Sequence, residues 1–142
     1  MADVTEILSR GLSAARLRVN ILASNIANAE TTRTPEGGPY KRKDVVQMAV
    51  PIKEPFSEII DNLYLAKPVV TQIVEDQSPP RKVYQPGHPD ADKDGFVSYP
   101  NINVVETMTD LMTAIRLYEA NVSAMEAARD MGRAASRIAL RF

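Results

Sequence analysis

Apolar residues recur at helical spacing at both ends of the chain, whereas the middle follows another pattern. Near the start, apolar positions step by four and three residues without a break, which keeps them on one narrow stripe of a helix. We therefore predict a helix from Asp3 to about Ala29, with Asp3 as its N-cap and Glu6 as its third helical residue. The stripe consists of Leu8, Leu12, Ala15, Val19, Leu22, Ile26 and Ala29.

A second, longer stripe occupies the last third of the chain. Asn103 is placed to cap a helix that runs from Val104 to Arg141, with Glu106 reaching back as in a capping box. Such a helix is about 55 Å long, more than the diameter of a small domain, so it needs a partner along its length. Its stripe comprises Val104, Met108, Leu111, Ile115, Tyr118, Val122 and Met125, and it changes phase beyond Met125.

All ten prolines lie between Pro35 and Pro100, so no long helix is expected there. Short β-type runs remain at Tyr40–Val50, Val69–Val74, Arg81–Tyr84 and Phe96–Tyr99, and Glu54–Leu65 could form a short helix or an irregular turn. The expected fold is mainly α with a small β or irregular middle, in which the two terminal helices form a coiled coil. The regions are an N-terminal helix at 1–30, a proline-rich loop and short β region at 31–100, and a C-terminal helix at 101–142.

Two long helices alone cannot complete a monomeric helix bundle, because no third or fourth helix is available. The two stripes must therefore pair with each other, with other copies of the chain, or both. We predict that they form an assembly seam through Leu8, Leu12, Val19, Leu22, Ile26, Met108, Leu111, Ile115, Tyr118, Val122 and Met125.

Composition narrows the possible functions. The 142 residues include no cysteine and one histidine, His88, so thiolate metal sites, cysteine nucleophiles and histidine triads are excluded. A net charge of -1 argues against nucleic-acid binding. No apolar run is long enough to span a membrane, and no cleaved signal pattern opens the chain, so conventional routes would leave it in the cytoplasm. We predict neither an enzyme nor a cofactor site.

One acidic motif remains open to two interpretations. Asp90, Asp92, Asp94 and Gly95 match the first half of a calcium-binding EF-hand loop, but the twelfth position is Asn101 and not Glu. The same residues suit a carboxylate-rich turn between two strands, with a positive φ angle at Asp94-Gly95. A calcium-binding module is therefore one alternative function, and a generic cytoplasmic coiled-coil adaptor is another.

The two helices also carry a specific resemblance. Ala23–Ala29 followed by Thr31-Thr32 resembles the N-terminal signature of the rod and hook family of bacterial flagellar axial proteins, and Asn103–Glu106 resembles its C-terminal pattern. The segments 31–40 and 86–92 look like those of proximal rod subunits in that family. The residues that we match to the family motifs are Asn25, Asn28, Thr31, Arg116 and Asn121.

This resemblance implies a structural function. Members of the family are exported by the flagellar type III apparatus without a cleaved signal and then polymerise helically. The expected partners are other copies of this chain, other flagellar rod proteins and the export machinery. The expected location is the rod of the basal body in the periplasmic space, after synthesis in the cytoplasm.

Overall fold

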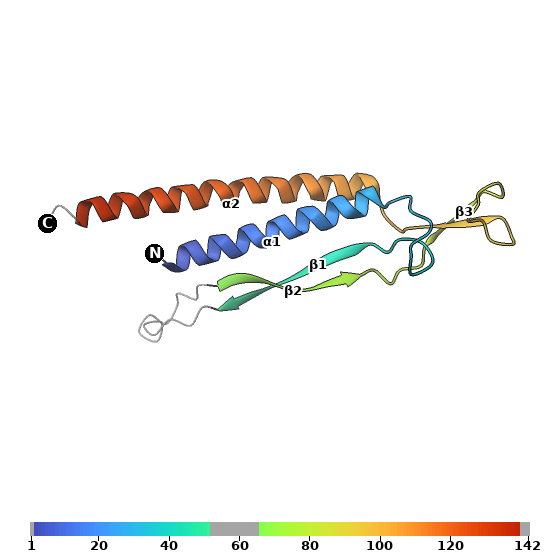
Figure 1. The fold of residues 1–142 in the computed structure, drawn as a ribbon, viewed down its shortest axis with the longest axis horizontal. Coiled ribbons are helices and arrows are strands. Elements are labelled where there is room, and N and C mark those ends of the chain that lie inside the picture. Colours follow the sequence, from blue (N-terminus) through green and yellow to red (C-terminus); the bar gives the residue numbers. More distant parts are fainter. Residues whose placement is uncertain (1, 52–65, 140–142) are drawn as a thin grey trace.

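The computed structural model describes residues 2–51 and 66–139. It contains a long helix at each end and two short antiparallel hairpins between them (Figure 1). The elements are α1 Ala2–Ala27, β1 Lys43–Pro51, β2 Ala66–Glu75, β3 Arg81–Tyr84, β4 Phe96–Tyr99 and α2 Val104–Ala139. Both predicted helices and all four predicted strands are present among the described residues, although α1 ends at Ala27 and not at Ala29. The short helix or turn predicted at 54–65 and the predicted end of the second helix at Arg141 lie outside the described residues.

The two helix starts differ in how well the sequence predicted them. The Asn103 side-chain Oδ1 accepts hydrogen bonds from the backbone N–H groups of Val105 (3.2 Å) and Glu106 (3.3 Å), which confirms the cap of α2. In contrast, α1 begins at Ala2, so Asp3 lies inside the helix and the predicted N-cap at Asp3 is wrong. The Glu6 carboxylate accepts a 2.7 Å hydrogen bond from Lys67 Nζ in β2.

Each strand pairs with its neighbour in sequence. β1 and β2 pair antiparallel from Lys43 opposite Glu75 to Pro51 opposite Ala66, with an irregularity between Val46 and Gln47. β3 and β4 form a second two-stranded sheet. Because both sheets have only two strands, every strand is an edge, which is the setting in which a strand tolerates proline.

The long elements form three layers, with α1 between α2 and the β1–β2 hairpin (Figure 1). Over the described residues, α2 contacts α1 and no other helix or strand, whereas α1 contacts α2, β1 and β2. The β3–β4 hairpin extends beyond the end of the helix pair where α1 ends and α2 begins. α2 has 36 residues and α1 has 26, so the last turns of α2 pass beyond the start of α1.

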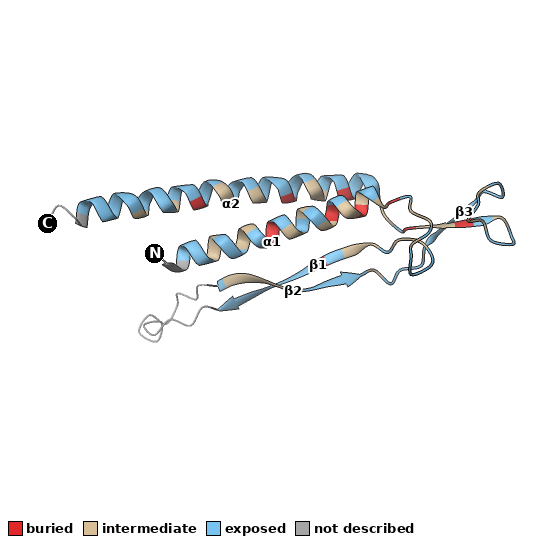
Figure 2. Cartoon of the chain, viewed as in Figure 1, coloured by how far each residue is buried: buried red, intermediate tan, exposed pale blue. Residues whose placement is uncertain are grey.

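Few residues are buried, and most of them belong to α1 and α2 (Figure 2). The accessible surface is 10548 Å². A compact monomer of 15.7 kDa is expected to expose only about 7,300 Å². The excess is larger than a standard protein–protein interface of about 1,600 Å². The chain therefore has the surface of an extended subunit.

Candidate assembly surfaces

Asn25 joins α1 to the start of β1. Its side chain is completely buried, Nδ2 donates to the Lys43 carbonyl (2.7 Å), and Oδ1 accepts from the Lys43 N–H (2.9 Å). The Tyr40 hydroxyl donates to the same Oδ1 atom (3.1 Å). The side-chain amide of Asn25 thus donates to and accepts from the backbone of Lys43, as the backbone of a neighbouring strand would. These hydrogen bonds hold the end of α1 against the start of β1.

The residues after Asn25 continue this junction. Asn28 Nδ2 donates to the Ser24 carbonyl (2.9 Å), and the Thr31 hydroxyl donates to Asn28 Oδ1 (3.2 Å). The Tyr40 N–H in turn donates to the Thr31 carbonyl (3.0 Å). These bonds occupy polar groups that the end of a helix leaves without partners. Three of the five predicted motif residues, Asn25, Asn28 and Thr31, therefore fix how the chain leaves α1.

The other two motif residues lie on α2 and are less enclosed. Asn121 is half-buried and faces α1, because its amide would contact a Cβ atom placed on Gly11 at 3.5 Å. Arg116 is exposed on the surface of α2. The structure therefore brings Asn121 into the helix pair and leaves Arg116 free for other contacts.

The contact of α2 with α1 is centred one residue earlier than the predicted stripe. Of the predicted seam residues on α2, Leu111, Tyr118, Val122 and Met125 are buried or half-buried, whereas Met108 and Ile115 are exposed. The buried and half-buried positions of α2 include the series Thr107, Leu111, Ala114, Tyr118, Asn121, Met125, Ala128 and Gly132, and Asp110 and Val122 beside it are also half-buried. This series keeps four- and three-residue steps past Met125 as far as Gly132. Small side chains at the contact let the two backbones approach closely.

Exposed apolar side chains form a second stripe on the first half of α2. Val105, Met108, Met112 and Ile115 follow one another at steps of three and four residues, and they are 75%, 52%, 58% and 39% exposed. This spacing places them on one side of the helix, turned away from Thr107 and Ala114. The sequence analysis missed Val105 and Met112, although their spacing to Met108 was the available signal. Apolar patches of this kind mark interaction sites.

Two carboxylates of the acidic turn, those of Asp90 and Asp92, are paired with protein groups. Asp90 accepts a hydrogen bond from the Thr32 hydroxyl (2.8 Å) and lies 3.6 Å from Arg33 Nη1. Asp92 Oδ1 accepts from the N–H groups of Asp94 (3.0 Å) and Phe96 (2.8 Å). Gly95 has a φ angle of 82°, which confirms the predicted strand-to-strand turn. In the described ranges, no three acidic or histidine side chains converge as metal ligands would.

The β1–β2 hairpin is tied to α1 at its far end by charge. Lys67 Nζ lies 2.7 Å from the Glu6 carboxylate, and Arg10 lies 3.8 Å from it. The hydrogen bond from Lys67, and then its charge, hold the pKa of Glu6 below its usual 4.5. Asn25 and Glu6 thus hold the two ends of one hairpin against one helix.

Over the residues described, neither α1 nor α2 is long and apolar enough to cross a membrane.

Comparisons with known proteins match the two helical regions separately. The family described as flagella basal body rod protein matches residues 6–33, and the family described as flagellar basal body rod FlgEFG protein C-terminal matches residues 93–138. Flagellar basal-body rod protein FlgC of Borreliella burgdorferi is 39% identical, with 93% of each chain covered. The FlgC proteins of Salmonella typhimurium (33%, 92% of each chain) and Bacillus subtilis (36%, 88% of this chain and 89% of the relative) are also similar. The chain belongs to the flagellar basal-body rod proteins of the FlgC type.

The proteins of this family are structural, and the two segments of this FlgC-type protein that match the family belong to the same part of the fold. Residues 6–33 contain most of α1 and the beginning of the Asn25 junction, and residues 93–138 contain β4 and nearly all of α2. The two matched regions are therefore the parts that pack together as the helix pair. The faces of this helix pair that the chain itself leaves uncovered are the candidate assembly surfaces of a rod protein.

Proposed function

We propose that this chain is a subunit of the proximal rod of the flagellar basal body, which polymerises helically through its terminal helices to form part of the drive shaft. The subunit is made in the cytoplasm, exported by the flagellar type III apparatus, and assembled in the periplasmic space. Its partners are further copies of itself and other rod proteins. Membership in the FlgC-type rod family supports the structural function, and the resemblance at both termini supports the route of export.

The observation that carries polymerisation is the exposed stripe of Val105, Met108, Met112 and Ile115 on α2. It lies beside the contact with α1, and it includes two residues of the predicted assembly seam. Four large apolar side chains on one helix face are unfavourable in water, and full burial of one such side chain contributes about 1.5–3 kcal/mol. A helix from a neighbouring subunit would cover them at the same four- and three-residue spacing.

The same face explains why α2 would enter a coiled coil with more than one partner. One side of α2 is already covered by α1, and the stripe occupies a different side. A helix with apolar side chains on more than one side is stable when it is surrounded. The large exposed surface of the single chain supports the same conclusion. We therefore place α2 inside the assembly and the hairpins toward its outside.

The test is to place charge on the stripe without disturbing the helix pair. Met108→Asp with Met112→Asp is expressed in a strain that lacks its own copy of the protein, and exported subunit, completed rods and motility are measured. We expect normal export but loss of rods and swimming, because each carboxylate would be buried without a partner when the polymer forms. Purified variant should keep the wild-type unfolding midpoint.

The matched control is Thr113→Asp, which adds a carboxylate one residue from Met112 but about 100° around the helix. This variant should still build rods. If the stripe variant swims normally, the assembly face lies elsewhere and the proposal is wrong.

A further inference from the structure

An aromatic pair stands exposed at the end of the β3–β4 hairpin. The Tyr84 side chain, at the last position of β3, is 64% exposed, and Phe96 opposite it in β4 is 39% exposed. Their rings meet edge to face, with centroids 5.3 Å apart and planes at 65°. Such pairs are favourable in themselves, and tyrosine is one of the residues that most often anchor protein–protein interfaces.

The ring of Tyr84 is held in place by the backbone below it. A Cβ atom at Gly95 would lie 2.9 Å from Tyr84 Cε2 and 3.2 Å from Pro86 Cβ, so a side chain at this position would displace the ring. The Gln85 N–H also donates to the Gly95 carbonyl (2.9 Å), which fixes the two strand ends. A ring that already packs against its own hairpin loses less conformational entropy on binding than a freely rotating one.

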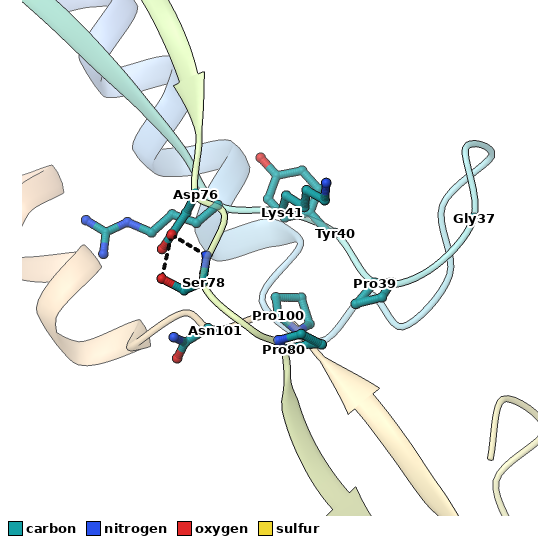
Figure 3. A pocket seen from close by; sticks show the side chains of 10 residues that line it. Gly37, Pro39, Tyr40, Lys41, Asp76, Ser78, Pro80, Pro100 and Asn101 are labelled. Atoms are coloured by element: carbon teal, nitrogen blue, oxygen red, sulfur yellow. Dashed lines mark hydrogen bonds between the residues drawn. The ribbon is translucent and has the colours of Figure 1, made fainter. Parts of the chain in front are cut away.

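A hollow of matching size lies at the base of the same hairpin. It is bordered by Tyr40, Pro80 and Pro100 and encloses about 140 Å³ (Figure 3). A cavity of about 150 Å³ with apolar walls is large enough to bind benzene. Lys41 and Arg42 also line the hollow. The hollow therefore has room for one aromatic side chain.

One wall of the hollow carries a hydrogen-bond acceptor. Asp76 Oδ1 accepts from the Ser78 N–H (2.8 Å) and from the Ser78 hydroxyl (2.6 Å), as Figure 3 shows. The side-chain bond, and then the backbone bond, hold the pKa of Asp76 below its usual 3.8, so its carboxylate is charged at neutral pH. Both bonds end on Oδ1, which leaves Oδ2 to accept a phenolic O–H.

We propose that Tyr84 of one copy inserts into the Tyr40–Pro80–Pro100 hollow of a second copy and donates its hydroxyl hydrogen to Asp76. This inference rests on the proposed polymerisation and adds a contact outside the helices. The ring and the hollow are different surfaces of one chain, so the contact is head-to-tail and leaves a free ring and a free hollow at either end. Contacts of this type propagate into helical polymers, as a rod requires.

The test uses a photo-crosslinker at the edge of the hollow in the full chain. The crosslinking residue p-benzoylphenylalanine replaces Gln77, an exposed residue between Asp76 and Ser78 that does not itself line the hollow. Rods are assembled in cells, and irradiated basal bodies are analysed by mass spectrometry. We expect a crosslinked dimer of this chain in which residue 77 is joined to the peptide that contains Tyr84 or Phe96. Adding Tyr84→Ser should lower the dimer yield about tenfold or more, the effect of removing an interface anchor, whereas Tyr84→Phe should keep most of it.

The control places the same crosslinker at Arg129 on α2, whose products should not change with Tyr84→Ser. Rods that assemble normally but give no dimer from position 77 would overturn this contact and leave the proposed function standing. A product that joins residue 77 to another protein, or to a different segment of the second copy, would also overturn it. Loss of rods in the stripe variant alone concerns the proposed function and not this contact.

Discussion

α1 and α2 both carry large apolar side chains at helical spacing, but the chain covers those of α1 and leaves many of those of α2 exposed. Among the described residues of α1, only Val4 is an exposed large apolar residue. On α2 the exposed residues of this kind are Val104, Val105, Met108, Met112, Ile115, Leu117, Met131 and Ile138. The difference follows from the layers, since α1 lies between α2 and a hairpin whereas α2 has α1 on one side only. α1 therefore stabilises the subunit, and α2 is the helix with surface left for neighbours.

The sharpest test of this difference substitutes one leucine in each helix. Leu22 of α1 is buried, whereas Leu117 of α2 is 54% exposed. Leu22→Asp should cost several kcal/mol of the free energy of unfolding, because a carboxylate would be buried without a partner. Leu117→Asp should change that free energy by about 0.5 kcal/mol or less. Urea denaturation followed by circular dichroism measures both, and equal losses would show that α2 is covered as fully as α1.

The next test removes the link between α1 and the hairpin. Asn25→Ala should lower the free energy of unfolding by about 2–4 kcal/mol, because the Lys43 N–H and carbonyl lose their partner in a buried site. Asn20→Ala is the matched control, since Asn20 is exposed on the same helix. We expect it to be neutral within about 0.5 kcal/mol. If both variants unfold at the same urea concentration, Asn25 does not hold the layers together.

A smaller effect should distinguish the two faces of α2. Ala114 is buried against α1, so Ala114→Leu should cost about 1–3 kcal/mol by overpacking. Ala120→Leu, at an exposed position of the same helix, should have almost no effect on the purified chain. Thermal unfolding compares the two. Tolerance of leucine at position 114 would favour the predicted contact through Ile115 over the observed one through Ala114.

The smallest effect concerns the ion pair that joins α1 to β2. Because the pKa of Glu6 is lower in the folded chain than its ordinary 4.5, its stabilising contribution is present above that value and is lost as the pH falls through the folded pKa. Glu6→Gln should remove this part of the acid dependence between about pH 5 and pH 3. Lys67→Met should remove the same part, and the double variant should remove no more. Additive losses would mean that the two residues act separately.

The sequence predicted what depends on neighbouring residues. The Asn103 cap, the β runs and the turn at Gly95 each rest on local backbone requirements, and the structure confirms them. The three- and four-residue spacing of the α2 contact was also predicted, but not which side of the helix faces α1. The prediction chose bulky Met108 and Ile115, whereas close packing of two helices selected the smaller Thr107 and Ala114. In sequence, an exposed apolar stripe looks the same as one that packs against the partner helix.

Contacts between distant parts of the chain were beyond sequence analysis. Asn25 was selected as a family residue, but its pairing with the backbone of Lys43 depends on where the loop brings β1. The pairing of β1 with β2 and the placing of that hairpin on α1 likewise depend on packing and not on local propensity. The hollow at the base of β3 joins residues from three segments, and no one of these segments has a recognisable motif.

The antiparallel packing of α1 against α2 also determines how the chain can reach its folded state. Gly11 of α1 lies beside Asn121 of α2, so most of the chain must be closed into a loop before the helices meet. Closing a long loop costs more conformational entropy than closing a short one, so contacts between residues far apart in sequence form slowly. The β3–β4 hairpin joins residues close in sequence and should form first. Pulse-labelled hydrogen exchange should therefore show protection of β3 and β4 before that of α1, and a newly delivered subunit would order its tip before it closes its ends.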